Sequence, residues 1–210
     1  MKKLMLIAAM MVATMGLQAQ QLFLKPMVGG TLSTLTKTDD SKLKLGFVGG
    51  MEVGCQVAGP FTITAGALYS QQGTYLEEMD NHKDCKRTTA YLNVPILANF
   101  YILPELCVKA GIQPGFLLTA KVEDKERRGE AWLEYKNTGK KGYEKFDLSI
   151  PVGISYEVTD VAVLEFRYNL GLSKIFGTDY TPDINIREGY SPDAKNSVMM
   201  LTIGYKIPLF

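Results

Sequence analysis

The chain contains one histidine, His82, which lies in the charged stretch DNHKDC at residues 80–85. An imidazole beside carboxylates could bind a metal ion, or could activate a serine in a lipid-modifying membrane enzyme. The polar surroundings instead predict a solvated loop. The sequence also carries no HExxH, CxxC, GxSxG or Walker-type glycine loop. We therefore expect no enzyme, no catalytic residue and no cofactor.

Three aspartates, Asp179, Asp183 and Asp193, lie in one polar segment near the C-terminus. Carboxylates are the ligands that calcium prefers, but the dense and regular spacing of a calcium-binding loop is missing. We interpret the segment as an ordinary polar loop and expect no metal site there.

The three cysteines, Cys55, Cys85 and Cys107, are widely spaced. An odd number leaves at least one thiol unpaired, so the cysteines do not form a disulfide framework. Cys55 and Cys107 lie in strand-like segments and Cys85 in a polar one. Whether any two of them form a disulfide stays open.

Charged residues recur at alternate positions of apolar segments, most clearly in VLEFRYNLGL at residues 163–172. Side chains alternate across a strand, so Leu164 and Phe166 share one face while Glu165 and Arg167 share the other. In a soluble barrel the apolar face would point inward. In a membrane barrel it would face lipid, and the charges would line the interior. The period alone does not decide between the two.

The elements that position these charges are predicted by the same period-two alternation, which indicates eight strands and no helix. The strands cover residues 22–35, 43–58, 61–73, 89–103, 106–121, 144–158, 161–173 and 196–209. Most are long enough for the roughly 9 to 11 tilted residues that cross a hydrocarbon core.

The connections between these strands fall into two sets. Short turns with Gly, Pro or Asp follow the second, fourth and sixth strands. Long polar loops at 74–88, 122–143 and 174–195 follow the third, fifth and seventh strands. Short turns on one rim and long loops on the other are typical of bacterial outer-membrane barrels. We therefore predict an all-β fold, an eight-stranded antiparallel up-and-down transmembrane β-barrel.

The faces opposite the apolar rows carry charges of both signs and many glycines, which suit a crowded interior better than a water-exposed wall. We therefore predict lipid outside and a polar lumen. Eight strands leave an interior that side chains fill, and buried charges there need partners. We expect a lumen-filling ion-pair network, with gating or selectivity charges as the alternative. The predicted lumen charges are Lys109, Asp147, Glu157, Glu165, Arg167 and Lys206.

Segments that alternate glycine and aromatic residues follow one another along the chain. They are YLNVPILANFY (91–101), VKAGIQPGFLLTAK (108–121), FDLSIPVGISYEV (146–158), EFRYNLGLSKI (165–175) and SVMMLTIGYKI (197–207). In order and spacing the chain resembles the PorT-like outer-membrane β-barrel family of Bacteroidetes, a porin family. The resemblance implies an outer-membrane barrel without established catalytic residues. Members commonly finish with Tyr-x-Phe, whereas this chain continues from Tyr205 to Phe210, a terminal aromatic of the kind that barrel-assembly machinery recognises.

The first 19 residues have a basic start, an apolar run and small residues before a polar onset, which is the layout of a secretory signal peptide. We predict cleavage after Ala19 and a barrel domain over residues 20–210. Cleavage would remove Lys2 and Lys3 and no acid, so the formal net charge would change from +1 to −1. That balance gives no reason to expect a nucleic-acid partner.

These patterns predict a protein of the Gram-negative outer membrane, with periplasmic termini and long loops outside. Its expected partners are outer-membrane lipid, the barrel-assembly machinery, and an envelope or secretion-system protein or an extracellular ligand. The predicted function is non-enzymatic presentation of loops for binding, adhesion or envelope and secretion-system assembly. The alternatives are a narrow pore or small-molecule conduit, a lipid-modifying enzyme, and a soluble ligand-binding barrel.

Overall fold

The computed structural model describes residues 21–37, 41–76, 82–128, 131–140, 142–177 and 193–209. The predicted signal peptide, most of the segment 174–195 and Phe210 lie outside these ranges. Within the described ranges, no helix is long and apolar enough to cross a membrane. The strands are β1 (Leu22–Leu35), β2 (Ser41–Lys42), β3 (Lys44–Ala58), β4 (Phe61–Leu76), β5 (His82–Asn93), β6 (Ile96–Tyr101), β7 (Leu106–Arg128), β8 (Ala131–Thr138), β9 (Phe146–Glu157), β10 (Ala162–Gly171), β11 (Asn196–Tyr205) and β12 (Ile207–Pro208).

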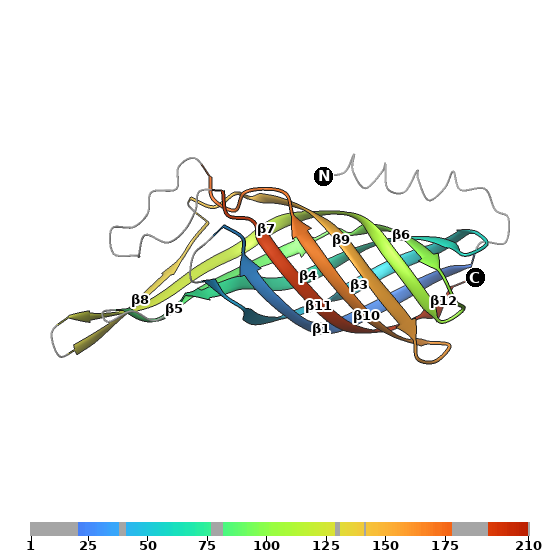
Figure 1. The fold of residues 1–210 in the computed structure, drawn as a ribbon, viewed down its shortest axis with the longest axis horizontal. Helices are drawn as coiled ribbons and strands as arrows, with labels where there is room; N and C mark the ends of the chain where they lie inside the picture. The colour runs from blue at the N-terminus through green and yellow to red at the C-terminus, as the bar shows by residue number, and fades with distance from the viewer. Residues whose placement is uncertain are drawn as a thin grey trace.

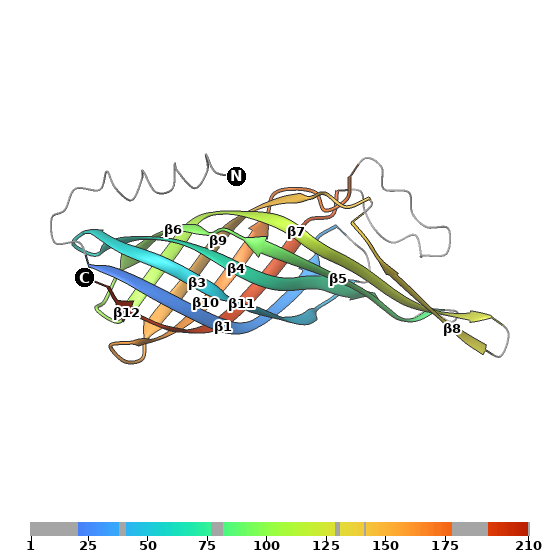
Figure 2. The ribbon, with the colours of Figure 1, turned by 180° about the vertical axis from the view of Figure 1, so that it is seen from behind.

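The strands form a closed antiparallel barrel (Figures 1 and 2). The wall runs in the order β1, β3, β4, β5 with β6, β7, β9, β10 and β11 with β12. Strand β11 then pairs with β1 from Met27–Gly204 to Leu35–Asn196, which closes the wall and removes its edges. The break between β5 and β6 falls at Pro95, which has no N–H to donate. The predicted eight-stranded barrel is confirmed.

The wall strands are strongly tilted. Tracing paired residues around the barrel from Leu24 leads back to the same strand at Thr34, a stagger of ten residues. With about 3.3 Å per residue and about 4.8 Å between strands, this stagger over eight strands tilts each strand by roughly 40°. A barrel of this size has an interior that side chains fill.

The wall is apolar outside and polar inside. The outward side chain of Leu201 is 56% exposed, whereas Glu52 is fully buried. In the segment 163–172, Leu164 and Phe166 point outward, while Glu165 and Arg167 are buried in the lumen. The predicted orientation of the two faces of this strand is therefore confirmed, with the apolar residues towards lipid.

Tight turns join β3 to β4, β6 to β7, and β9 to β10 at one end of the barrel, which we call the turn end (right in Figure 1). Gly59 in the first turn has a φ of 49°, in the left-handed region that favours glycine. In the third turn the N–H of Ala162 donates to Thr159 Oγ1 at 3.0 Å. Strand β1 begins and β12 ends at this same end, where Phe23 pairs with Pro208.

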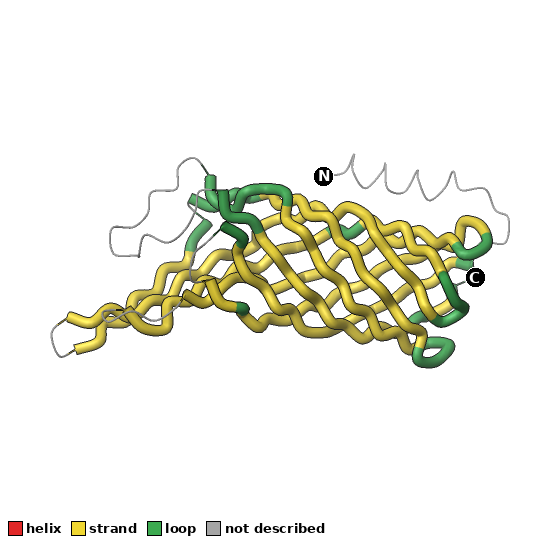
Figure 3. Tube along the Cα trace, viewed as in Figure 1, coloured by secondary structure: helices red, strands yellow, loops and turns green. Residues whose placement is uncertain are grey.

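At the opposite end, which we call the loop end, β4, β5, β7 and β8 run on beyond the barrel (Figures 1 and 3). Strand β7 pairs with β8 out to Arg128–Ala131, and β5 pairs with β7 out to His82–Glu126. The prediction of loops at 74–88 and 122–143 was therefore wrong, because strands occupy much of each segment. Residues 124–128 are all charged, so the sequence shows no apolar alternation by which this part of β7 could be recognised as a strand.

Candidate functional site: a lumen filled in layers

Five charged side chains meet in the turn-end half of the lumen and form what we call the charge cluster. They come from β1, β3, β7 and β10, at positions that strand alternation turns inward. Each is at most 7% exposed. The members of the cluster are Lys25, Glu52, Lys109, Glu165 and Arg167.

Glu165 is the centre of the charge cluster. Its Oε2 lies 2.8 Å from Lys25 Nζ and 2.7 Å from Lys109 Nζ, and its Oε1 pairs with Arg167. Glu52 lies across the lumen, with Oε2 2.8 Å from Lys25 Nζ and Oε1 2.7 Å from Arg167 Nη2. Each carboxylate thus contacts at least two cations, which offsets the cost of removing it from water.

Two glycines make room for the charge cluster. A Cβ atom at Gly66 would lie 2.6 Å from Glu52 Cγ and 2.5 Å from the carbonyl oxygen of Met51. A Cβ at Gly153 would lie 3.1 Å from the Cα of Arg167. The glycines on the inner face therefore allow close approach of neighbouring strands and charged side chains.

A second ion pair lies nearer the turn end. Lys206 Nζ is 3.0 Å from Glu157 Oε1, which also accepts a hydrogen bond from Tyr101 Oη at 2.7 Å. The Lys206 ammonium lies 4.9 Å from the centroid of the Phe23 ring, a cation–π contact. These four residues form a partly buried partition at the turn end of the lumen.

Asp147 is separate from both groups. It begins the inward row of β9 near the loop end and is 6% exposed. Its carboxylate accepts hydrogen bonds from Asn196 Nδ2 at 3.3 Å and from Ser173 Oγ at 3.2 Å. Among the described residues no ion pair to Asp147 is found. The structure therefore places the six predicted lumen charges in three groups, in which Lys109, Glu165 and Arg167 meet, Glu157 pairs with Lys206, and Asp147 stands apart.

Uncharged side chains, both apolar and polar, fill the lumen between the charge cluster and Asp147. Beyond the charge cluster towards the loop end, the buried side chains of Met27, Val48, Leu68, Val198 and Met200 pack together in the lumen. Since these side chains point inward from β1, β3, β4 and β11, they fill the space that a water-filled pore would need.

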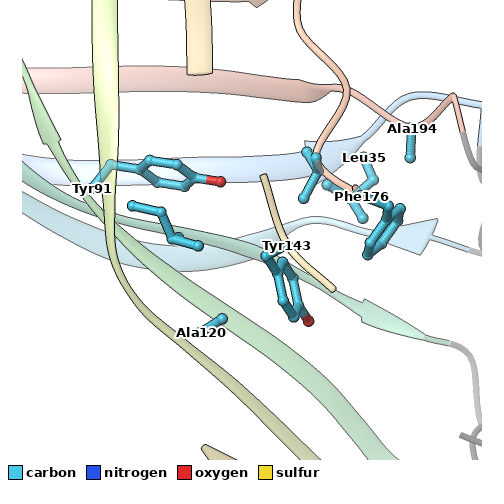
Figure 4. Close-up of a cluster of buried hydrophobic side chains, with 8 residues drawn as sticks. Leu35, Tyr91, Ala120, Tyr143, Phe176 and Ala194 are labelled. Carbon is cyan, nitrogen blue, oxygen red and sulfur yellow. The ribbon is translucent and has the colours of Figure 1, made fainter. Parts of the chain in front are cut away.

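A second apolar cluster closes the loop end of the lumen (Figure 4). Tyr143 and Phe176 come from two different connections and form a β-bridge with each other. The guanidinium carbon of Arg87 lies 4.9 Å from the Phe176 ring centroid and 5.5 Å from that of Tyr143. Tyr91 and Leu35 reach the same cluster from the wall. The loop end is therefore covered by aromatic side chains rather than open.

Lys25 is a cluster member that our sequence prediction did not select. Strand alternation could have found it, because Lys25 lies between the inward residues Phe23 and Met27. Lys25 and Glu52 are direct Cα partners on β1 and β3. The signal was present, but only the strand register shows that these two charges meet.

The predicted loop histidine, His82, is the first residue of β5 and its Cα is paired with that of Glu126. Asp179 and Asp183 lie outside the described residues. Asp193 Oδ1 is 2.5 Å from Lys174 Nζ, and this ammonium holds the pKa of the Asp193 carboxyl below its ordinary value.

Cys107 carries a free thiol in the lumen and is 1% exposed. The side chain of Cys85 lies outside the described part of the chain. In that described part, no group of three or more His, Cys, Asp or Glu residues is arranged to hold a metal ion.

Residues 14–177 match the family described as outer membrane protein beta-barrel domain. The chain belongs to this family. It is thus an outer-membrane barrel, and its location in the outer membrane agrees with the prediction. No curated protein matches its sequence.

Solved structures of other outer-membrane proteins are similar to this outer-membrane barrel. Ail, the attachment invasion locus protein of Yersinia pestis, is 16% identical, with 89% of this chain and 99% of Ail covered and a TM-score of 0.51. OprG from Pseudomonas aeruginosa is 11% identical, with 90% and 96% covered and a TM-score of 0.46. Neisserial surface protein A is 12% identical, with 91% and 100% covered and a TM-score of 0.43. At 16% identity, the similarity to Ail shows the fold alone.

The interior of this outer-membrane barrel can pair charges and exclude bulk water, because buried ion pairs and two buried apolar clusters fill much of it. Among the described residues, the strand extension at the loop end reaches furthest beyond the barrel wall (Figure 1). The lumen and the extension therefore offer different chemistry.

Proposed function

We propose that this outer-membrane barrel is a non-enzymatic scaffold that presents its loop end outside the cell for binding, adhesion or assembly of an envelope or secretion system. The turn end and both chain ends lie in the periplasm. Insertion is by the barrel-assembly machinery. The order and spacing of the glycine- and aromatic-containing strand segments support a relationship to the PorT-like barrels of Bacteroidetes.

The observation that carries this proposal is the strand extension above a filled lumen. β7 continues to Arg128 and pairs with β8, so this hairpin is held by the same ladder that forms the wall. A hairpin continuous with a barrel keeps its orientation better than a loop that has no strand pairing. Because side chains fill the lumen, presentation of the loop end is favoured over transport of a solute through the barrel.

The test removes the hairpin and leaves the barrel. Val122 and Asn137 are direct Cα partners, so residues 123–136 are replaced by Asn-Gly, which suits a two-residue hairpin turn. We expect the variant to stay in the outer-membrane fraction and to migrate differently before and after boiling, as a folded barrel does. Intact cells should lose adhesion and the proteins that co-purify with wild type after cross-linking.

A matched control is Asp193→Ala, which changes the loop end outside the hairpin and should retain both properties. The proposal is wrong if the folded, hairpin-free barrel keeps the adhesion and the cross-linked partners of wild type.

A further inference from the structure

A small cavity of about 20 Å³ lies in the lumen between the charge cluster and the turn-end partition. Lys25 and Lys109 of the charge cluster line it on one side, and Lys206 and Glu157 line it on the other. Such a space exceeds what one water molecule requires and excludes a phosphate or an organic acid. The cavity is thus surrounded by three ammonium groups and one carboxylate.

At this cavity, Lys109 has more hydrogen-bond donors than it has acceptors. An ammonium carries three N–H donors. Among the described residues, Lys109 Nζ has one acceptor, Glu165 Oε2 at 2.7 Å. Because Lys109 is only 7% exposed, its other donors cannot reach bulk water freely and face the cavity that the residue lines.

The charges around the cavity do not balance. The charge cluster and the turn-end pair together contain four cations, Lys25, Lys109, Arg167 and Lys206, against three carboxylates, Glu52, Glu157 and Glu165. One positive charge is therefore left over in this part of the lumen. Burial of an uncompensated charge is expensive, so a counter-ion in the cavity would be strongly favoured.

We propose that the cavity binds one small monovalent inorganic anion, of the size of chloride or bromide, between Lys25, Lys109 and Lys206. The anion enters from the turn end, where a solvent-open vestibule of about 260 Å³ also contacts Glu157, Lys206 and Tyr101. The cavity and the vestibule share the lining residues Phe23, Thr62, Tyr101, Glu157 and Lys206, so the anion passes between these side chains. This site is independent of the surface presentation proposed above.

The direct test uses bromide as the probe. The full chain is purified in detergent, crystallised in sodium bromide and measured at the bromine absorption edge. We expect an anomalous peak in the cavity within hydrogen-bond distance of Lys109 Nζ. A well-ordered lumen without such a peak would overturn the proposal, because the cavity would then hold water alone.

A solution measurement uses chloride. At constant ionic strength, replacing gluconate by chloride should raise the unfolding midpoint of the wild type until the site is saturated, since a ligand of the native state stabilises it. Lys109→Met should remove this chloride dependence, and Lys174→Met, at an exposed lysine of the loop end, should keep it.

If Lys109→Met does not fold, Cys107→Met serves instead, because Cys107 lines the cavity and a longer side chain fills it without changing any charge. That variant should also lose the chloride dependence. Equal midpoints of the wild type in chloride and gluconate, or an undiminished chloride effect in the folded variants, would contradict the anion site.

Discussion

Lys109 Nζ and Glu165 Oε2 lie 2.7 Å apart inside the barrel, although the two residues are 56 positions apart in sequence and their strands, β7 and β10, are separated by β9. The pair therefore spans the curved inner wall rather than joining neighbouring strands. It is one of several contacts that make Glu165 the anion around which three cations gather.

Substitution Glu165→Leu should destabilise the barrel by about 3–5 kcal/mol, because it leaves three buried cations with only Glu52. The double substitution Glu165→Leu with Lys109→Leu should cost clearly less, since it removes a cation together with its acceptor. Guanidinium unfolding in phospholipid vesicles, followed by circular dichroism, measures both. Asp193→Ala, at an exposed pair, should leave the transition unchanged. Equal losses for the single and double variants would contradict this expectation, because a buried Lys109 without Glu165 would then carry no cost.

Reconstituted protein should show no steady conductance on the nanosiemens scale in planar bilayers. The charge cluster, the apolar layer around Leu68 and the aromatic cover of Tyr143 and Phe176 each fill the lumen at a different height. Phe176→Ala should therefore remain non-conducting, because the two lower layers stay in place. A stable large channel in the wild type would instead support the pore alternative.

Substitution Gly66→Val should destabilise the barrel by about 1–3 kcal/mol or prevent its closure, because its Cβ would overlap Glu52 and the backbone of Met51. The heat-modifiability gel and an unfolding titration report the effect. Gly139→Ala is the matched control, since a Cβ there meets nothing within 4 Å. Normal stability of Gly66→Val would mean that the strands can separate without cost.

Substitution Leu201→Arg should cost about 2–4 kcal/mol, because Leu201 lies midway along β11 and is 56% exposed on the lipid face. Leu103→Arg, at a similarly exposed residue of a tight turn, should cost no more than about 1 kcal/mol, since the membrane surface accommodates the charge. Unfolding titrations in phospholipid vesicles measure the loss of stability for each of the two substitutions. Equal effects would argue against a lipid-facing wall.

Much of the fold could be predicted because one face of each wall strand meets lipid. The first strand was predicted at 22–35 and is observed at Leu22–Leu35. The short turns were predicted from Gly, Pro and Asp, whose local chemistry does not depend on distant contacts. The predicted end of this strand at residue 121 came earlier than the observed end at Arg128, because residues 124–128 are all charged and show no apolar alternation.

The sequence by itself determined that Glu165 and Arg167 share a face opposite Leu164 and Phe166, because alternation along a strand is a local property of the backbone. Only the tertiary structure decided which charges meet. The stagger of the closed wall sets the height of each strand, and so brings Lys109 to Glu165 while leaving Asp147 with Asn196 near the loop end. Partner choice in the lumen depends on that closure, and no single strand encodes it.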